Sequence, residues 1–215
     1  MADQEKNKDQ QNKKKLIIII WAVFLVVVAA GVVLFAANYG KLKKATEDKK
    51  TEKVYEKNTH SEINILVRKY LTALTNCDQD SLKMMVTDPS QFDDMTIYIN
   101  RSNNVTGYED IDCYTLPGMT DNSYLVYVVS YVSLKDVKST PMDIMVFYIV
   151  NSEGELLINN QTDPKIQDYI DQKTLEQDIQ DVYRMVKEDE DRCYEEDETL
   201  RQFYERINGK NDSEE

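Results

Sequence analysis

Residues 124–134, Tyr-Leu-Val-Tyr-Val-Val-Ser-Tyr-Val-Ser-Leu, form the strongest predicted β-strand of this 215-residue chain. β-Branched and aromatic side chains favour extended backbone. Both faces of this strand are apolar or aromatic, a pattern typical of strands that are covered on both sides. We therefore expect the strand to be buried on both faces within a folded domain.

Further strands are predicted on either side of this one. Residues 108–116 alternate with a period of two and end at Pro117-Gly118, and residues 142–150 are nearly all apolar. A loop ending in Gly154 then returns the chain as a short strand over residues 155–159. These consecutive strands predict an antiparallel meander.

Helices are predicted before the meander. Thr59 and Glu62 fit a capping box, and the apolar residues that follow recur at spacings of three and four up to Cys77. A short second helix follows and ends near Asp88-Pro89. Residues 91–104 fit either a strand or a helix. Helices followed by strands indicate an α+β fold, with helices packed on a curved antiparallel sheet over residues 58–163.

The end of the chain is acidic and helical. Residues 164–207 carry three short apolar stripes, which either dock on the sheet or make contacts outside the domain. Residues 208–215 are predicted to be a disordered tail.

A membrane segment is predicted near the start. Leu16–Ala37 is a run of 22 residues without a charge, which is long enough to span a bilayer as a helix. The alternatives are a buried helix and a signal peptide cleaved near Ala29-Ala30-Gly31. The run continues past Gly31, so we favour an uncleaved signal anchor that binds the lipid bilayer as a single-pass transmembrane helix.

Lysines flank this segment on both sides. Lys13–Lys15 touch it, and the preceding tail of residues 1–15 is short, which places the N-terminus in the cytoplasm. Residues 38–57 are rich in Lys and Glu and predict a stalk, either a plain spacer or a contact for anionic lipid. The folded part would then be extracytoplasmic, at the cell membrane.

Charge separates the chain into two parts. The whole chain has a net charge of −13, and residues 58–215 hold 14 basic and 32 acidic side chains. An acidic body argues against nucleic-acid binding, which needs a basic face. A protein or cell-wall partner is expected instead, and a homo-oligomer is an open alternative.

The order of elements resembles the nuclear-transport-factor-2-like superfamily of cone-shaped domains, over roughly residues 58–163. The run Gly107-Tyr-Glu-Asp-Ile-Asp-Cys-Tyr-Thr-Leu-Pro-Gly118 is similar to that of uncharacterised single-pass surface proteins of Gram-positive gut bacteria. The superfamily includes isomerases, dehydratases, ligand-binding modules and a bitopic assembly protein of type IV secretion. Fold alone therefore implies no single function.

Two function classes follow. The first is a non-enzymatic binding or scaffolding domain at the cell surface, within an assembly that resembles secretion or conjugation machinery. The second is a small-ligand carrier or an isomerase-like or dehydratase-like enzyme that uses the cone. Asp143 is the one acid inside an apolar strand, and a buried acid beside tyrosines suits proton abstraction. The candidate pocket comprises Asp143, Tyr124, Tyr127, Tyr131 and Tyr148.

The alternative for Asp143 is a place at a strand end or sheet edge, where it is solvated or hydrogen-bonded. No catalytic residue, metal site or cofactor is predicted, since the single His and the three Cys offer few ligands. Cys77 and Cys113 are either a disulfide pair or small buried residues.

Overall fold

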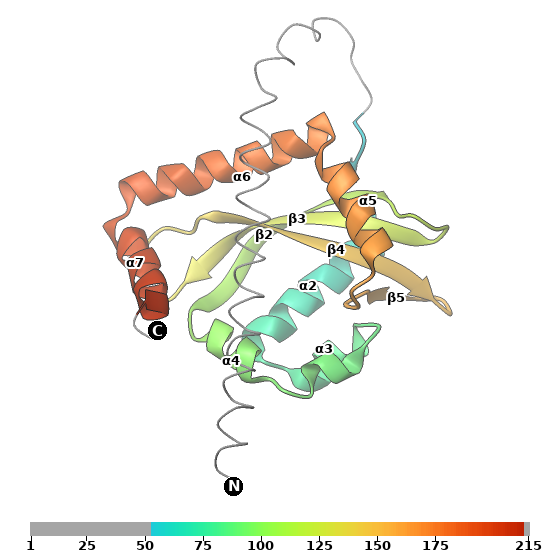
Figure 1. Ribbon diagram of the computed structural model, residues 1–215, viewed down its shortest axis with the longest axis horizontal. Coiled ribbons are helices and arrows are strands. Elements are labelled where there is room, and N and C mark those ends of the chain that lie inside the picture. Colours follow the sequence, from blue (N-terminus) through green and yellow to red (C-terminus); the bar gives the residue numbers. More distant parts are fainter. Residues whose placement is uncertain (1–52, 213–215) are drawn as a thin grey trace, which may run out of the picture. The chain divides into compact units, whose positions relative to one another are not determined.

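A five-stranded antiparallel sheet is the centre of the protein, as the computed structural model of residues 53–212 shows (Figure 1). Its strands follow chain order, so the predicted meander is confirmed. They are β1 (Glu56–Lys57), β2 (Val105–Pro117), β3 (Ser123–Leu134), β4 (Met142–Ser152) and β5 (Glu155–Ile158).

Helices cover both faces of the sheet, which confirms the α+β class (Figure 1). Before the long strands come α2 (Ser61–Asn76), α3 (Gln79–Met84), the 3₁₀ turn η1 (Pro89–Phe92) and α4 (Thr96–Ser102). After the strands come α5 (Pro164–Thr174), α6 (Gln177–Glu196) and α7 (Glu198–Asp212). The acidic segment predicted to be helical is therefore three helices.

The first core layer joins α2 to one face of the sheet. The apolar residues of α2 share one helix face because they recur at spacings of three and four. Ile63, Val67 and Leu71 are buried there in one cluster with Val126 and Val128 of β3.

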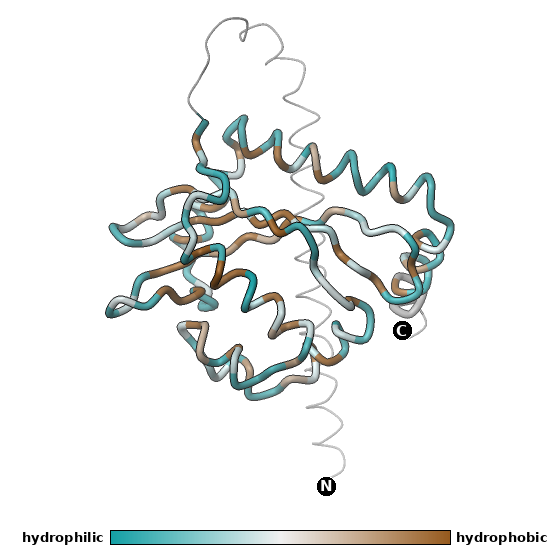
Figure 2. Tube along the Cα trace, turned by 180° about the vertical axis from the view of Figure 1, so that it is seen from behind, coloured by the Kyte–Doolittle hydropathy of each residue, from teal (hydrophilic) through white to brown (hydrophobic). Residues whose placement is uncertain are grey.

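The second core layer joins α6 to the opposite face. Side chains alternate along a strand, so Leu125, Tyr127 and Val129 point away from the first layer. They pack with Ile179 and Val182 of α6. In Figure 2 the apolar colour follows the strands and the side of α6 that faces them, while the outer side of α6 is hydrophilic. The acidic helices thus dock on the sheet.

A β-bulge in β2 bends the sheet. Between Glu109 and Asp112 the register with β3 shifts, and Asp110 takes a positive φ of 47°. A bulge of this kind strengthens the local twist of a strand. The guanidinium of Arg68 on α2 donates to the carbonyl of Ile111 in the bulge, over 2.7 Å.

One local expectation is corrected, and two open alternatives are decided. Thr59 does not cap α2, because its hydroxyl donates to Glu56 and the N-cap position is His60. The ambiguous residues 91–104 contain helix α4 and no strand. The three cysteines are all free thiols, so the disulfide alternative for Cys77 and Cys113 is not formed.

Both ends of the folded unit differ from the sequence-based segments. Residues 53–57, counted above with the stalk, belong to the folded unit: the N–H of Val54 donates to Asp178 of α6, and β1 pairs with β2. Helix α7 continues to Asp212, into the stretch predicted as a tail. Among the described residues no helix has the length and apolar character needed to cross a bilayer. The predicted anchor at residues 16–37 lies outside the described residues.

Candidate functional site

The five residues of the candidate pocket lie on both faces of the sheet. Tyr124 packs with the α2 layer, and Tyr127 packs with the α6 layer. The register pairs Tyr131 with Met142 and Tyr148 with Leu125, which places both tyrosines on the α6 side. Asp143 lies two residues before Met145 of the α2 layer, so it shares a face with Tyr124 alone.

Two of these tyrosines hold neighbouring segments in place. Tyr127 is fully buried, and its hydroxyl shares a 2.8 Å hydrogen bond with Thr174 at the end of α5. Burial raises the pKa of Tyr127 above its ordinary value. The hydroxyl of Tyr148 accepts from the N–H of Met119 at 2.8 Å and lies 2.9 Å from the Ser123 hydroxyl. These contacts fix the β2–β3 turn and the end of α5.

A shallow hollow lies at the open end of the α2 layer, next to α4. It is lined by Leu74, Thr75, Arg101, Ser102, Val105 and Tyr108, and holds about 170 Å³ including open solvent. Small-molecule sites are clefts of about 300–1,000 Å³ that enclose most of their ligand, whereas even this smaller volume is partly open solvent. Asp143 is not among the lining residues. The hollow therefore lacks both the size and the acid that a proton-abstracting pocket would need.

Neither a reactive thiolate at Cys113 nor a metal site is indicated by the structure of the described residues. Burial raises the pKa of the Cys113 thiol to about 11, which disfavours the nucleophilic thiolate at neutral pH. Across residues 53–207 no group of three or more His, Cys, Asp or Glu side chains is placed to hold a metal ion.

One edge of the sheet is only partly paired along β4. Strand β5 pairs only with Ile149–Ser152, so the preceding part of β4 has β3 on one side and no strand on the other within the described residues. We call the outer side of Met142–Phe147 the β4 edge.

Alternate residues of β4 present their backbone groups to this edge. The carbonyl of Tyr148 accepts from the N–H of Asn159, on the side of β5. The carbonyl of Pro141 accepts instead from the N–H of Val132, on the side of β3. In β4, the backbone N–H and C=O groups of even-numbered residues therefore point away from β3, and those of odd-numbered residues point toward β3. The β4 edge accordingly displays the N–H and C=O groups of Met142, Ile144 and Val146.

The side chains of the β4 edge are apolar and only partly covered. All six residues from Met142 to Phe147 are half-buried, and five of them are apolar. Ile144 and Val146 contact the α6 layer, whereas Met145 and Phe147 contact the α2 layer. An edge strand that is apolar and open is a template for pairing with another chain.

Two carboxylates occupy the backbone donors at the start of the edge. Asp189 of α6 accepts from the N–H of Met142 at 2.9 Å, and Asp143 accepts from the N–H of Ile144 at 2.8 Å. Burial raises the pKa of Asp143, the Ile144 N–H and Arg101 lower it, and Glu190 raises it further. Asp143 is thus hydrogen-bonded at a sheet edge, which is the alternative that the sequence left open.

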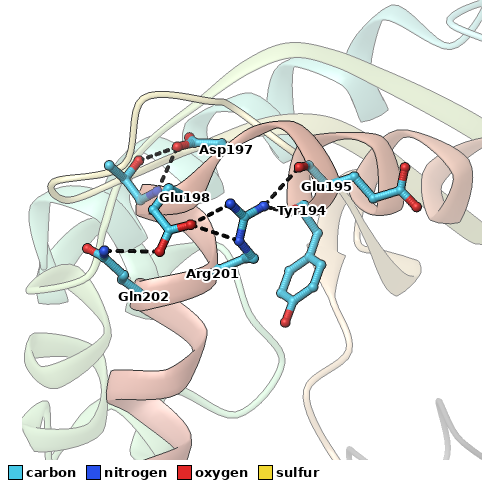
Figure 3. Close-up of polar contacts among 7 residues, drawn as sticks. Tyr194, Glu195, Asp197, Glu198, Arg201 and Gln202 are labelled. Atoms are coloured by element: carbon cyan, nitrogen blue, oxygen red, sulfur yellow. Dashed lines mark hydrogen bonds and ion pairs between the residues drawn. The ribbon is translucent and has the colours of Figure 1, made fainter.

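The junction of α6 and α7 fixes the helices that flank the β4 edge (Figure 3). Arg201 donates to the carbonyls of Tyr194 at 2.7 Å and Glu195 at 2.8 Å, and it forms an ion pair with Glu198. These bonds satisfy carbonyls at the end of α6 that have no partner within the helix.

Asp197 ties the same junction to the loop before β4. Its carboxylate accepts from the hydroxyl and N–H of Thr199 and from the N–H of Ser139. These hydrogen bonds, that of the Thr199 hydroxyl above all, hold the pKa of Asp197 well below its usual range. The loop, α6 and α7 therefore form one connected border at the start of β4.

The sequence offered no local signal for this arrangement. Asp189 lies 47 residues after Met142, and only the fold shows that the two meet. Comparison with known proteins adds nothing to the geometry, since no protein-family model, curated protein or solved structure matches the chain.

Proposed function

We propose that this protein is a membrane-anchored binding or scaffolding domain at the cell surface and that it acts without catalysis. Leu16–Ala37 holds it in the bilayer with the N-terminus in the cytoplasm, and the folded unit that begins at Lys53 lies outside. The resemblance to nuclear-transport-factor-2-like domains suggests a place in a multi-protein membrane assembly.

The β4 edge is the observation that supports this proposal. Its half-buried apolar residues and outward backbone groups offer a ready contact for a protein segment. Strand addition to an open edge is a common mode of peptide recognition, because backbone hydrogen bonds supply affinity and side chains supply specificity. The fixed border formed by α6 and α7 keeps the edge in one shape.

Site-specific photo-cross-linking in intact cells tests the binding function. A photoreactive amino acid replaces Val146 at the β4 edge, Tyr194 on α6 or Met84 on α3, one position at a time in the full chain. We expect a discrete protein adduct from Val146 and none from Met84, which is exposed on the far helix layer. Absence of adducts from all three positions contradicts a binding role.

The proposed orientation has its own test. A single Cys replaces Gly209 in a chain whose three native Cys are replaced, and intact cells are treated with a membrane-impermeant thiol reagent. Labelling without lysis is expected. Labelling only after lysis contradicts an extracytoplasmic domain.

A further inference from the structure

We infer that the β4 edge binds an extended segment of a partner protein in which apolar residues flank a Lys or Arg, and that this segment adds to the sheet as a sixth strand. This inference rests on the proposed function and names the chemistry of its partner. The basic residue lies beside Asp143, and the backbone carbonyls of the segment replace Asp143 and Asp189 on the edge amides.

The length of the edge sets the length of the segment. Met142, Ile144 and Val146 present outward backbone groups, and beyond them the Tyr148 carbonyl is already bonded to Asn159. The open window is therefore Met142–Phe147, about 20 Å of extended chain. A partner strand of five to seven residues fills it.

The carboxylates make the edge selective. While the site is empty, Asp189 and Asp143 satisfy two outward N–H groups that would otherwise attract any strand. Capping an edge with acids in this way limits indiscriminate pairing. An incoming carbonyl must displace each carboxylate, which then needs a new partner.

A basic residue is the partner that suits these displaced acids. Asp143 is half-buried, Glu190 adds negative charge near it and Arg101 adds positive charge, but no ion pair joins Asp143 to Arg101 among the contacts of the described residues. Asp189 retains its ion pair with Arg192, so the acid that lacks a strong partner after displacement is Asp143. A Lys or Arg on the α2 side of the added strand meets it.

Charge also argues against a second copy of this chain as the occupant. Antiparallel pairing of two β4 edges centred on Ile144 sets Asp143 opposite Met145, so the two Asp143 side chains become diagonal neighbours. Diagonal neighbours in a sheet remain within reach of each other, so two like charges there disfavour this pairing. The acidic body, with a net charge of −18 over residues 58–215, adds long-range repulsion.

The test uses the full chain in lipid nanodiscs and two blocked nine-residue peptides. Both peptides alternate Val and Thr, and they differ only in carrying Lys or Glu at two central positions. Fluorescence anisotropy measures binding. We expect the Lys peptide to bind at least about tenfold more tightly than the Glu peptide, and Asp143→Asn to reduce that preference to about threefold or less.

A pair of variants at one position separates backbone pairing from side-chain contact. Val146→Pro removes an N–H that faces away from β3, so the internal ladder of the sheet is kept. Val146→Ala loses side-chain contact but retains the N–H. We expect Val146→Pro to weaken the Lys peptide about tenfold relative to Val146→Ala.

Amide hydrogen exchange of the unsubstituted chain gives a measurement that does not depend on the folding of a variant. The Lys peptide should slow exchange at Ile144 and Val146 and leave α3 unchanged. Equal binding of the two peptides, no binding at about millimolar concentration, or self-association through β4 overturns the inference. If any of these results is found but the photoreactive group at Tyr194 still forms a protein adduct in cells, strand addition at the β4 edge is wrong while the proposed binding function stands.

Discussion

Asp143 combines a hydrogen bond at the sheet edge with the cost of a buried charge. Its carboxylate accepts from the adjacent Ile144 N–H at the sheet edge. Burial nevertheless raises its pKa, so the folded protein binds the proton more tightly than the unfolded chain does. Stability is therefore lost as the pH rises through the folded-state pKa.

Asp143→Asn should raise the melting temperature at pH 7, because the amide still accepts from Ile144 without a buried charge. The gain should shrink as the pH falls through the raised pKa of Asp143, where the acid becomes protonated. Thermal unfolding of residues 53–215 between pH 4 and pH 8 measures this. Asp121→Asn, at an exposed turn, is the control. A gain that is independent of pH would contradict the assignment.

For Asp143, the sequence predicted that the residue is unusual but not where in the sheet it lies. Asp143 stood out as the only acid in an apolar strand, and its two alternatives were a pocket and an edge. The choice depends on the register with β3 and on which part of β4 is covered by β5. Neither can be read from local composition, which is also why the five pocket residues were grouped across two faces.

Among the elements, strand β2 contains a β-bulge that the hydrophobic pattern of the sequence did not predict. Asp110 holds a left-handed backbone conformation there, and Arg68 bonds the next carbonyl. Asp tolerates this conformation better than most residues, whereas β-branched residues are strained in it.

Asp110→Val should therefore destabilise the domain by about 1–2 kcal/mol, while Asp110→Gly should stay within about 0.5 kcal/mol of the original protein. Urea unfolding of residues 53–215 measures both free energies. Because the Asp110 side chain is exposed, neither variant loses packing contacts, and the difference between their unfolding free energies reports the backbone conformation. Equal destabilisation by the two variants would show that the bulge conformation is not required.

Helix and strand positions were otherwise well predicted, because periodicity depends on local spacing. The strands over residues 108–116, 124–134 and 142–150 and the helix before Cys77 all appear in the structure. Residues 91–104 were ambiguous since spacings of two and of three overlapped. Tertiary contact decided for a helix, with Phe92 buried and Tyr98 packed against its cluster.

At the largest scale, the folded unit that begins at Lys53 is a sheet between two helix layers, and the acidic helices complete its core. Residues of α6 and α7 are buried to 7% exposure or less: Ile179, Val182, Val186, Leu200 and Phe203. Burying one such side chain contributes about 1.5–3 kcal/mol, and a domain's net stability is about 5–15 kcal/mol. We therefore expect these helices to be needed for folding.

Ending the chain at Gln161 should abolish cooperative unfolding, because the α6 face of the sheet is then exposed. Ending it at Asp212 should leave the unfolding transition unchanged. Circular dichroism during thermal unfolding compares the two truncated chains. A stable domain that ends at Gln161 would mean that α5–α7 are accessory and free to bind elsewhere.

The central claim is that the β4 edge is the surface through which this protein meets its partner. Hydrogen exchange followed by mass spectrometry tests it most directly, comparing the full chain in its native membranes with the same chain purified into nanodiscs. Slower exchange over Met142–Phe147 in the native membranes is the predicted result, with α3 unchanged between the two. Equal exchange at the β4 edge in both settings would contradict the claim.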